Sequence, residues 1–323
     1  MERGNGLISE HDLRQYKPVY REPVIGSFKD IEIISMGPPS SGGLLLIHML
    51  NALENFQIDT LGWNSTDYIH LLTEVAKRAY ADRAQHLGDP DFWNNPRDLF
   101  LSKAYAKNRI AKISMKKHTP SNEVYPGTYR DDESDETTHY SVVDSQGNAV
   151  AITSTLNQNF GNKHVVAGAG FFLNNEMDDF SVKPGTPNYW GLVGDKANAI
   201  EPNKRPLSSM TPTILMYEGI PIMTIGSPGG SRIIGFVSKV LVAVIDWNLS
   251  IQEAINLPNF LSRNKGTELE KDSSVEALRP ELEARGHIVN TFTATSGLHG
   301  IHRTNRGLEG GVDPRREGVV LWD

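Results

Sequence analysis

The sequence contains no cysteine, no internal repeat and no long apolar run. The absence of cysteine excludes disulfide bonds, a cysteine nucleophile, zinc ribbons and iron–sulfur centres. No window approaches the roughly 18 consecutive apolar residues that a membrane-spanning helix needs. The net charge of -7 argues against a nucleic-acid partner, because binding to phosphates requires a basic surface. The 10 histidines show no metal-ligand spacing, so we expect no metal ion and no other cofactor.

The composition of the remaining chain is that of an ordinary folded protein. Its 323 residues suffice for one large or two ordinary domains, and 38% of them are hydrophobic and 22% charged. The start, MERGNGLISEHDL, lacks the basic-then-apolar pattern of a signal peptide. Periodicity is lost over 114–136, a segment that ends in the acidic run DDESDE and is typical of a solvated linker. We therefore expect a boundary in this segment.

Both predicted hairpins lie after this boundary, whereas helices are predicted on both sides of it. A short strand over 31–36 is expected to end in the glycine- and proline-rich turn 37–43, which leads into a helix over 44–53. Apolar residues at helical spacing predict a second helix over about 65–86. The elements expected after the boundary are the hairpins 139–144/149–155 and 211–217/220–225, a helix over 233–247, and a short helix capped by Ser250 and Glu253. This mixture indicates an α+β or layered fold.

Thr137 lies where the acidic segment meets the first predicted hairpin. An internal threonine is a weak nucleophile, but at a new chain terminus its own α-amine, with a pKa of about 7.7–8.0, can accept the hydroxyl proton. If the hairpin turns between Gln146 and Gly147, Thr155 lies opposite Thr138 and brings a second hydroxyl beside Thr137. The alternative is that Thr137 is an ordinary strand residue, as we also expect for the neighbouring His139.

Three further segments carry groups that suit ligand binding. The segment 227–232, SPGGSR, precedes a helix and can turn backbone amides toward a phosphate or a developing oxyanion. It lacks the lysine of a phosphate loop, the dinucleotide-binding spacing and the first glycine of the serine-hydrolase elbow. The segment 174–179, NNEMDD, concentrates acceptors for an ammonium group, and Ser208 and Ser209 offer paired hydroxyls. Each segment taken singly also suits an ordinary polar turn.

Together these segments resemble the γ-glutamyltranspeptidase (glutathione hydrolase) family. The resemblance covers nearly the full length and rests on the order and spacing of several stretches. These are PPSSGG (38–43), YADR (80–83), LGDPDF (87–92), TTHYSVVD (137–144), LNNEMDDF (173–180), NKRPLSSM (203–210) and GSPGGSR (226–232).

The resemblance implies a four-layer αββα Ntn-hydrolase fold and a precursor that cuts itself between Glu136 and Thr137. Residues 1–136 would be the C-terminal part of a large subunit and residues 137–323 the small subunit of a heterodimer. Thr137 would attack glutathione or another γ-glutamyl amide, and water or the amine of an amino acid or peptide would release the acyl group. Met1 aligns inside the large subunit, so the fold would be incomplete. A signal region for the periplasm or cell exterior, and an arginine for the substrate α-carboxylate, would lie outside this sequence.

The resemblance also implies roles for individual residues. The matching positions are Gly229 and Gly230 for the oxyanion hole, Thr155 for the bond to the nucleophile, Asn157, Glu176 and Asp179 for the substrate α-amino group, and Ser208 and Ser209 for its α-carboxylate. The segment 184–195 matches a lid loop with Tyr189 or Trp190 as a gating aromatic residue.

Two alternatives to this function stay open. One is a related acylase for glutaryl-type side chains or an enzyme that processes poly-γ-glutamate. The other is an inactive, truncated remnant that binds γ-glutamyl compounds or nothing. Intact Asn157, Glu176 and Asp179 favour a donor with a free α-amino acid head.

Overall fold

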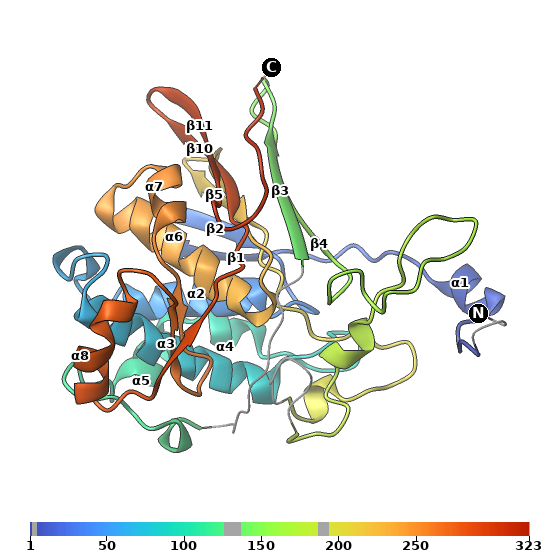
Figure 1. Ribbon diagram of the computed structural model, residues 1–323, viewed down its shortest axis with the longest axis horizontal. Coiled ribbons are helices and arrows are strands. Elements are labelled where there is room, and N and C mark those ends of the chain that lie inside the picture. Colours follow the sequence, from blue (N-terminus) through green and yellow to red (C-terminus); the bar gives the residue numbers. More distant parts are fainter. Residues whose placement is uncertain (2–4, 126–136, 187–193, 323) are drawn as a thin grey trace.

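The computed structural model describes residue 1 and residues 5–125, 137–186 and 194–322. At its centre lies a six-stranded antiparallel sheet in the order β1-β2-β5-β6-β10-β11 (Figure 1). Its strands are β1 (Val24–Phe28), β2 (Ile31–Ser35), β5 (Thr213–Tyr217), β6 (Ile220–Gly226), β10 (His299–Thr304) and β11 (Gly307–Val312). Because β2 pairs with β5, one sheet joins the parts of the chain before and after the predicted boundary.

Helices cover one face of this sheet. The helix α2 (Gly42–Leu53) packs on β1 and β2, and α6 (Ile233–Trp247) packs on β6. All residues of α2 are buried, since α3 (Thr66–His86), α5 and α6 surround it on the sides away from the sheet. The other helices and 3₁₀ turns are α1 (Glu10–Gln15), α4 (Arg97–Leu101), α5 (Lys103–Ile110), α7 (Ile251–Asn256), α8 (Arg279–Ala284), η2 (Ile58–Thr60), η3 (Ser121–Glu123), η4 (Glu176–Asp179), η5 (Lys196–Asn198), η6 (Gly230–Arg232) and η7 (Glu276–Leu278).

Two small sheets complete the fold. One is the three-stranded sheet of β7 (Phe260–Leu261), β8 (Thr267–Glu270) and β9 (Val289–Phe292). The other is the hairpin of β3 (Thr137–Val143) and β4 (Ala149–Thr155), which packs on the central sheet against β5, β6 and β10. Its outward residues Tyr140, Val142, Val150 and Ile152 are exposed. Helices, central sheet and hairpin thus form three successive layers, the αββ part of an αββα arrangement, and the described residues form no helical layer beyond the hairpin.

Most predicted elements are confirmed. The strand β2, the helices α2, α3 and α6, and the hairpin β5–β6 lie where periodicity and turn residues placed them. Ser250 caps α7 and forms the predicted capping box with Glu253. The α+β class is confirmed as well. Residues 126–136 of the predicted boundary segment lie outside the described residues.

The predicted register of the β3–β4 hairpin is wrong by one residue. Thr155 lies opposite Thr137 itself, not opposite Thr138. The last strand pair is Val143 with Ala149, so the loop has an odd number of residues and is centred on Gln146. The Asp144 carboxylate accepts bonds from the amides of Gln146 and Asn148, at 2.9 and 2.8 Å, and thereby closes this longer loop.

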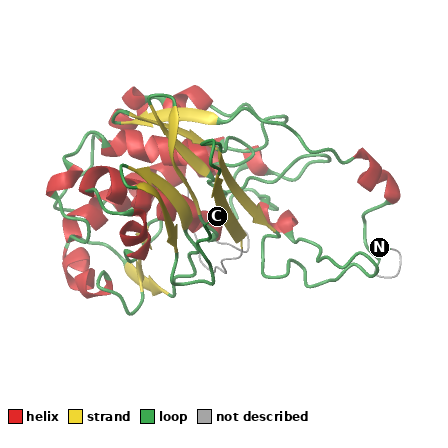
Figure 2. Ribbon diagram, turned by 90° about the horizontal axis from the view of Figure 1, so that it is seen from above, coloured by secondary structure: helices red, strands yellow, loops and turns green. Residues whose placement is uncertain are grey.

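The first helix lies apart from the layered body. In both overall views α1 sits at the end of an extended segment (Figures 1 and 2), and none of its residues is buried. No helix within the described ranges is both long enough and apolar enough to cross a membrane.

Candidate active site

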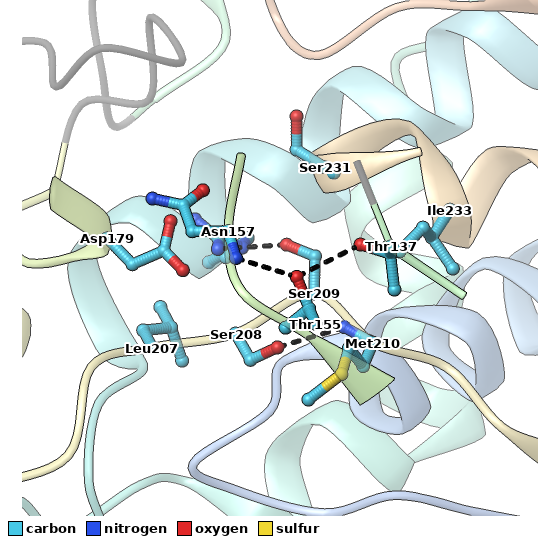
Figure 3. Close-up of a pocket in the computed structure, with 12 residues that line it drawn as sticks. Thr137, Thr155, Asn157, Asp179, Leu207, Ser208, Ser209, Met210, Ser231 and Ile233 are labelled. Carbon is cyan, nitrogen blue, oxygen red and sulfur yellow. Dashed lines mark hydrogen bonds between the residues drawn. The ribbon is translucent and has the colours of Figure 1, made fainter. Parts of the chain in front are cut away.

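A cavity that is partly open to solvent lies between the open end of the β3–β4 hairpin, the end of α3 and the start of α6. Figure 3 shows Thr137 at one end of it and Asp179 at the other. The lining residues are Arg83, Thr137, Thr155, Asn157, Asp179, Leu207, Ser208, Ser209, Met210, Gly230, Ser231 and Ile233. Most of the predicted site residues therefore meet in one cavity, although they come from four separate stretches of sequence.

Thr137 begins β3 and turns its half-buried side chain toward this cavity. Its hydroxyl donates to the hydroxyl of Thr155, with 3.3 Å between the oxygens. Thr155 Oγ1 also accepts a bond from the backbone amide of Asn157, at 2.9 Å. Glu136, on the other side of the predicted cleavage position, lies outside the described residues.

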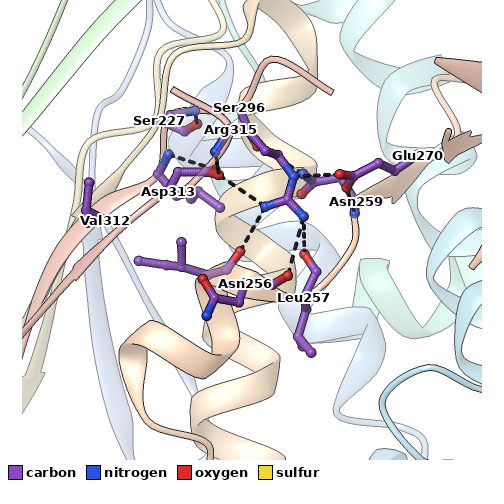
Figure 4. A network of polar contacts seen from close by, with 12 residues as sticks. Ser227, Asn256, Leu257, Asn259, Glu270, Ser296, Val312, Asp313 and Arg315 are labelled. Atoms are coloured by element: carbon purple, nitrogen blue, oxygen red, sulfur yellow. Dashed lines mark hydrogen bonds and ion pairs between the residues drawn. The ribbon is translucent and has the colours of Figure 1, made fainter. Parts of the chain in front are cut away.

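The backbone of Thr137 is held from the C-terminal segment. Arg316 donates from Nη1 to the Thr137 carbonyl oxygen at 3.2 Å. The neighbouring Arg315 forms ion pairs with Glu270 and Asp313, at 2.7 and 3.1 Å, and donates to the Leu257 carbonyl (Figure 4). This network fixes the segment from which Arg316 reaches the hairpin.

Asn157 connects the hairpin to the acidic segment. It adopts a left-handed backbone conformation with φ 71°, which asparagine tolerates better than most residues. Its side-chain amide donates to the carbonyl oxygen of Asn175 at 3.1 Å. The side chain of Asn175 in turn accepts from the amide of Gln158 at 3.0 Å. Asn157 is thus held beside η4.

Glu176 and Asp179 lie on the single turn η4, and their carboxyl groups are hydrogen-bonded to each other. Burial raises the pKa of Asp179 well above its usual range, and the charge of Glu176 raises it further. Burial also raises the pKa of Glu176. Two carboxyls in this arrangement share a proton. Glu176 Oε1 is buried and has no hydrogen-bond partner among the described residues, so the pair offers an acceptor to a cationic group.

Ser208 and Ser209 line the same cavity as Asp179. The Ser208 amide donates to the Pro39 carbonyl at 2.8 Å, and the Ser208 carbonyl accepts from the amide of Ser41 at 2.9 Å. The predicted turn 37–43 is therefore the support of the serine segment. Ser208 Oγ accepts a hydrogen bond from the Met210 amide at 3.1 Å, as a serine in an ordinary polar turn would. Ser209 Oγ instead accepts a hydrogen bond from Arg83 at 3.1 Å.

Gly229 and Gly230 lead into α6 through η6. Gly229 has φ 132°, and a Cβ atom there would come within 2.6 Å of the Phe236 ring. The loop can therefore take this conformation only with glycine. Gly230 lines the cavity, whereas Gly229 does not. Amides at a helix start have no intrahelical acceptor and can face a developing negative charge.

Other predictions have mixed outcomes. His139 is a buried strand residue, as expected, and burial lowers its pKa to about 3. Glu176 does not line the cavity but bonds to Asp179, which does. Tyr189 and Trp190 of the predicted lid loop lie outside the described residues. Across the described part of the chain, no group of three or more His, Asp and Glu side chains is arranged to hold a metal ion.

Two arginines of this site were not predicted from the sequence. Arg83 lines the cavity from the last turn of α3, and Arg316 holds Thr137. Arg83 belongs to the YADR stretch, for whose residues no role was predicted. No local pattern marks the second.

Comparisons with known proteins show which family the chain is similar to. Residues 1–322 match the family model described as gamma-glutamyltranspeptidase. The chain is 47% identical over 318 residues to the glutathione hydrolase proenzyme of Escherichia coli (strain K12), covering 98% of this chain and 55% of that protein. The chain thus spans about half the length of the curated relatives it matches.

Solved structures show the same likeness. A Thr→Ala mutant of Helicobacter pylori γ-glutamyltranspeptidase is 45% identical, with a TM-score of 0.53 over 55% of this chain and 100% of that one. The cephalosporin acylase of Bacillus halodurans is 26% identical, with a TM-score of 0.83 over 100% of this chain and 57% of that one. These similarities confirm the predicted Ntn-hydrolase fold.

Proposed function

The chain belongs to the γ-glutamyltranspeptidase family, and from this we propose that it is the catalytic part of a γ-glutamyl hydrolase and transferase. In this proposal the peptide bond between Glu136 and Thr137 is cut. Residues 1–136 are the C-terminal part of the large subunit, and residues 137–323 are the small subunit that associates with it. The shared six-stranded sheet supports this division, because it would hold the two chains together after cleavage.

One observation carries the proposal. The Thr137 hydroxyl and the Asp179 carboxyl, which is hydrogen-bonded to Glu176, lie at the two ends of one cavity, and Ser208 and Ser209 lie between them (Figure 3). A γ-glutamyl compound has a matching arrangement, with an amide carbonyl at one end and an α-amino acid head at the other. An ammonium group suits the carboxyl pair, and a carboxylate suits two hydroxyls.

The reaction follows from these positions. The α-amine of Thr137, freed by cleavage, takes the hydroxyl proton while Thr137 Oγ1 attacks the γ-carbonyl carbon. Backbone amides of Gly229 and Gly230 face the oxyanion of the tetrahedral intermediate. The C–N bond breaks, the leaving amine takes the proton, and an ester links the γ-glutamyl group to Thr137. Water then yields glutamate, or the amine of an amino acid or peptide yields a new γ-glutamyl amide.

The donor is proposed to be glutathione or a similar γ-glutamyl amide. The names of the relatives support glutathione, and the intact Asn157, Glu176 and Asp179 support a donor with a free α-amino group. By family resemblance we place the complete protein in the periplasm or outside the cell.

A second candidate is an acylase for glutaryl-type side chains, favoured by the full-length likeness to a cephalosporin acylase. A glutaryl group lacks the α-amino group, so it would leave the carboxyl pair without a partner. Release of p-nitroaniline from γ-glutamyl and glutaryl anilides distinguishes the two. We expect cleavage of the γ-glutamyl compound, and cleavage of the glutaryl compound alone would overturn the proposal.

A further inference from the structure

Arg83 has a position in the cavity that the proposed reaction leaves unused. It lies in the last turn of α3, and its side chain is almost fully buried, with 4% of the residue exposed. Burying a guanidinium requires hydrogen-bond partners. Its Nε donates to Ser41 Oγ at 2.8 Å, and its Nη2 donates to Ser209 Oγ at 3.1 Å. A buried cation is thus built into the wall of the cavity.

The bond to Ser209 determines what that hydroxyl can do. A guanidinium only donates hydrogen bonds, so Ser209 Oγ must act as acceptor toward Arg83. The hydroxyl proton of Ser209 is then left to donate elsewhere, and Ser209 itself lines the cavity. Arg83 therefore sets the Ser209 hydroxyl as a donor toward an occupant of the cavity.

Ser41 extends this control to the neighbouring serine. Because Ser41 Oγ accepts from Arg83, it donates its own proton to the carbonyl oxygen of Ser208, at 2.8 Å. Ser41 is fully buried, so no solvent competes for these bonds. One guanidinium thus holds the Ser209 side chain directly and the Ser208 backbone through one intermediate hydroxyl.

The charges in the cavity support the same role for Arg83. Among the described residues that line the cavity, Arg83 alone carries a positive charge, and the carboxyl of Asp179 lies near it. The charge of Arg83 opposes the rise in the pKa of Asp179 that burial and Glu176 cause. A substrate carboxylate entering beside two carboxyl groups would be repelled without such a cation. Arg83 therefore serves both ends of an α-amino acid head.

We propose that Arg83 is a specificity-determining positioning residue: through Ser209 and Ser41 it orders the hydroxyls that bind the substrate α-carboxylate, and it compensates the negative charge of the Glu176–Asp179 pair. This inference rests on the proposed function, because it assumes a γ-glutamyl donor in the cavity. It also gives the YADR and PPSSGG stretches a common role, since Arg83 and Ser41 belong to them.

Binding of two small probes tests this role without catalysis. L-Glutamate carries both the α-amino and the α-carboxylate group, whereas 4-aminobutyrate lacks the α-carboxylate. We expect Arg83→Met in the 323-residue chain to weaken calorimetric binding of L-glutamate about tenfold to a hundredfold, and to leave that of 4-aminobutyrate within about twofold. Arg83→Lys keeps the charge but cannot donate to both serines in the geometry of a guanidinium. Its affinity for L-glutamate should therefore lie between those of the wild type and Arg83→Met.

The matched control is Arg285→Met, which removes an arginine paired with Asp67 at 2.6 Å, outside the cavity. It should change neither affinity. Equal weakening of both probes by a folded Arg83→Met, or unchanged binding of L-glutamate, would overturn the inference. If Arg83→Met does not fold, Ser41→Ala decides, because it keeps the guanidinium and should still weaken L-glutamate selectively. If both variants keep the wild-type preference for L-glutamate over 4-aminobutyrate, the proposed role of Arg83 is overturned.

The outcome for Arg83 is separable from that for the proposed function. A wild-type chain that binds L-glutamate selectively but releases no p-nitroaniline from the γ-glutamyl anilide would contradict the reaction and leave the role of Arg83 in place. A wild-type chain that binds neither probe would overturn both.

Discussion

Thr155 faces Thr137 across the first residue pair of the β3–β4 hairpin, with 3.3 Å between their hydroxyl oxygens. Thr155 Oγ1 also accepts a bond from the backbone amide of Asn157, so its position is set by the residues that follow β4. The Thr137 side chain is thereby directed into the cavity rather than along the edge of the hairpin.

Replacing Thr137 tests the cleavage. We expect the purified chain to separate into fragments 1–136 and 137–323, because the hydroxyl of Thr137 can attack the preceding peptide carbonyl. Thr137→Ala should stay a single chain, and Thr137→Ser should be cut, since serine keeps the hydroxyl. Intact-mass spectrometry after timed incubation checks all three. Cleavage of Thr137→Ala at this bond would contradict the assignment of the nucleophile.

Replacing Thr155 tests the bond to the nucleophile. Thr155→Val keeps the shape of the side chain and removes the acceptor for Thr137, so we expect γ-glutamyl anilide turnover to fall about tenfold, equivalent to about 1.4 kcal/mol. The control is Ser154→Ala, an exposed neighbour on the opposite face of β4, which should behave as wild type. Unchanged kcat in Thr155→Val would show that the observed bond plays no part in turnover.

Two glycines with positive φ separate a catalytic effect from ordinary strain. Gly229→Ala must move the loop, because the new Cβ would lie 2.6 Å from Phe236, and we expect kcat to fall about a hundredfold as the amides shift. Gly219→Ala, with φ +79° and nothing within 4 Å, should cost about 1–2 kcal/mol of stability and leave kcat unchanged. Steady-state kinetics and urea unfolding distinguish these effects. Equal kcat losses in both variants would argue against an oxyanion role.

The shared proton of Glu176 and Asp179 predicts how binding depends on pH. Because the pKa of both groups is raised, the pair stays partly protonated above the usual carboxyl range and attracts an ammonium group less strongly there. KM for a γ-glutamyl anilide should therefore fall as pH rises and the pair loses this proton. Asp179→Asn should raise KM and flatten its pH profile. A KM that rises with pH over this range in the wild type would contradict this role.

His287 predicts how stability depends on pH. It lies 2.7 Å from His70 and 2.6 Å from the Thr267 hydroxyl, and burial followed by the charge of His118 lowers its pKa from 6.5 to about 3. The folded chain therefore binds fewer protons than the unfolded chain between these values. Its stability should fall as pH drops below 6.5, by up to about 1.4 kcal/mol per pH unit for this residue.

His287→Gln isolates this contribution. Urea unfolding at several pH values should show a shallower slope than in the wild type, although stability at neutral pH falls as well. The control His164→Gln replaces an exposed histidine and should keep the wild-type slope. A slope unchanged by His287→Gln would mean that other groups cause the acid sensitivity.

Local sequence patterns predicted several elements of the fold, but not β1, the strands β7 to β11, or the helices α4, α5 and α8. Apolar spacing in 65–86 predicted α3, because a buried helix face requires that period, and the helix predicted over 233–247 coincides with α6. The predicted register of the β3–β4 hairpin is wrong because the register depends on the hydrogen bonds that Asp144 accepts within the loop, which a two-residue turn rule does not include. The order of strands in the central sheet could not be predicted either, because β2 pairs with β5, which lies far along the chain.

The sequence by itself determined the family, several helices, two hairpins and the residue types at the site, because these depend on local spacing and on the order of motifs. Tertiary structure alone decided that Thr137 faces Thr155 and that Arg316 holds Thr137. It also decided that Arg83 reaches Ser209, more than a hundred residues away, at 3.1 Å. Such contacts arise from packing of distant segments, and the physical need of a buried guanidinium for acceptors becomes visible only when the surrounding residues are in place.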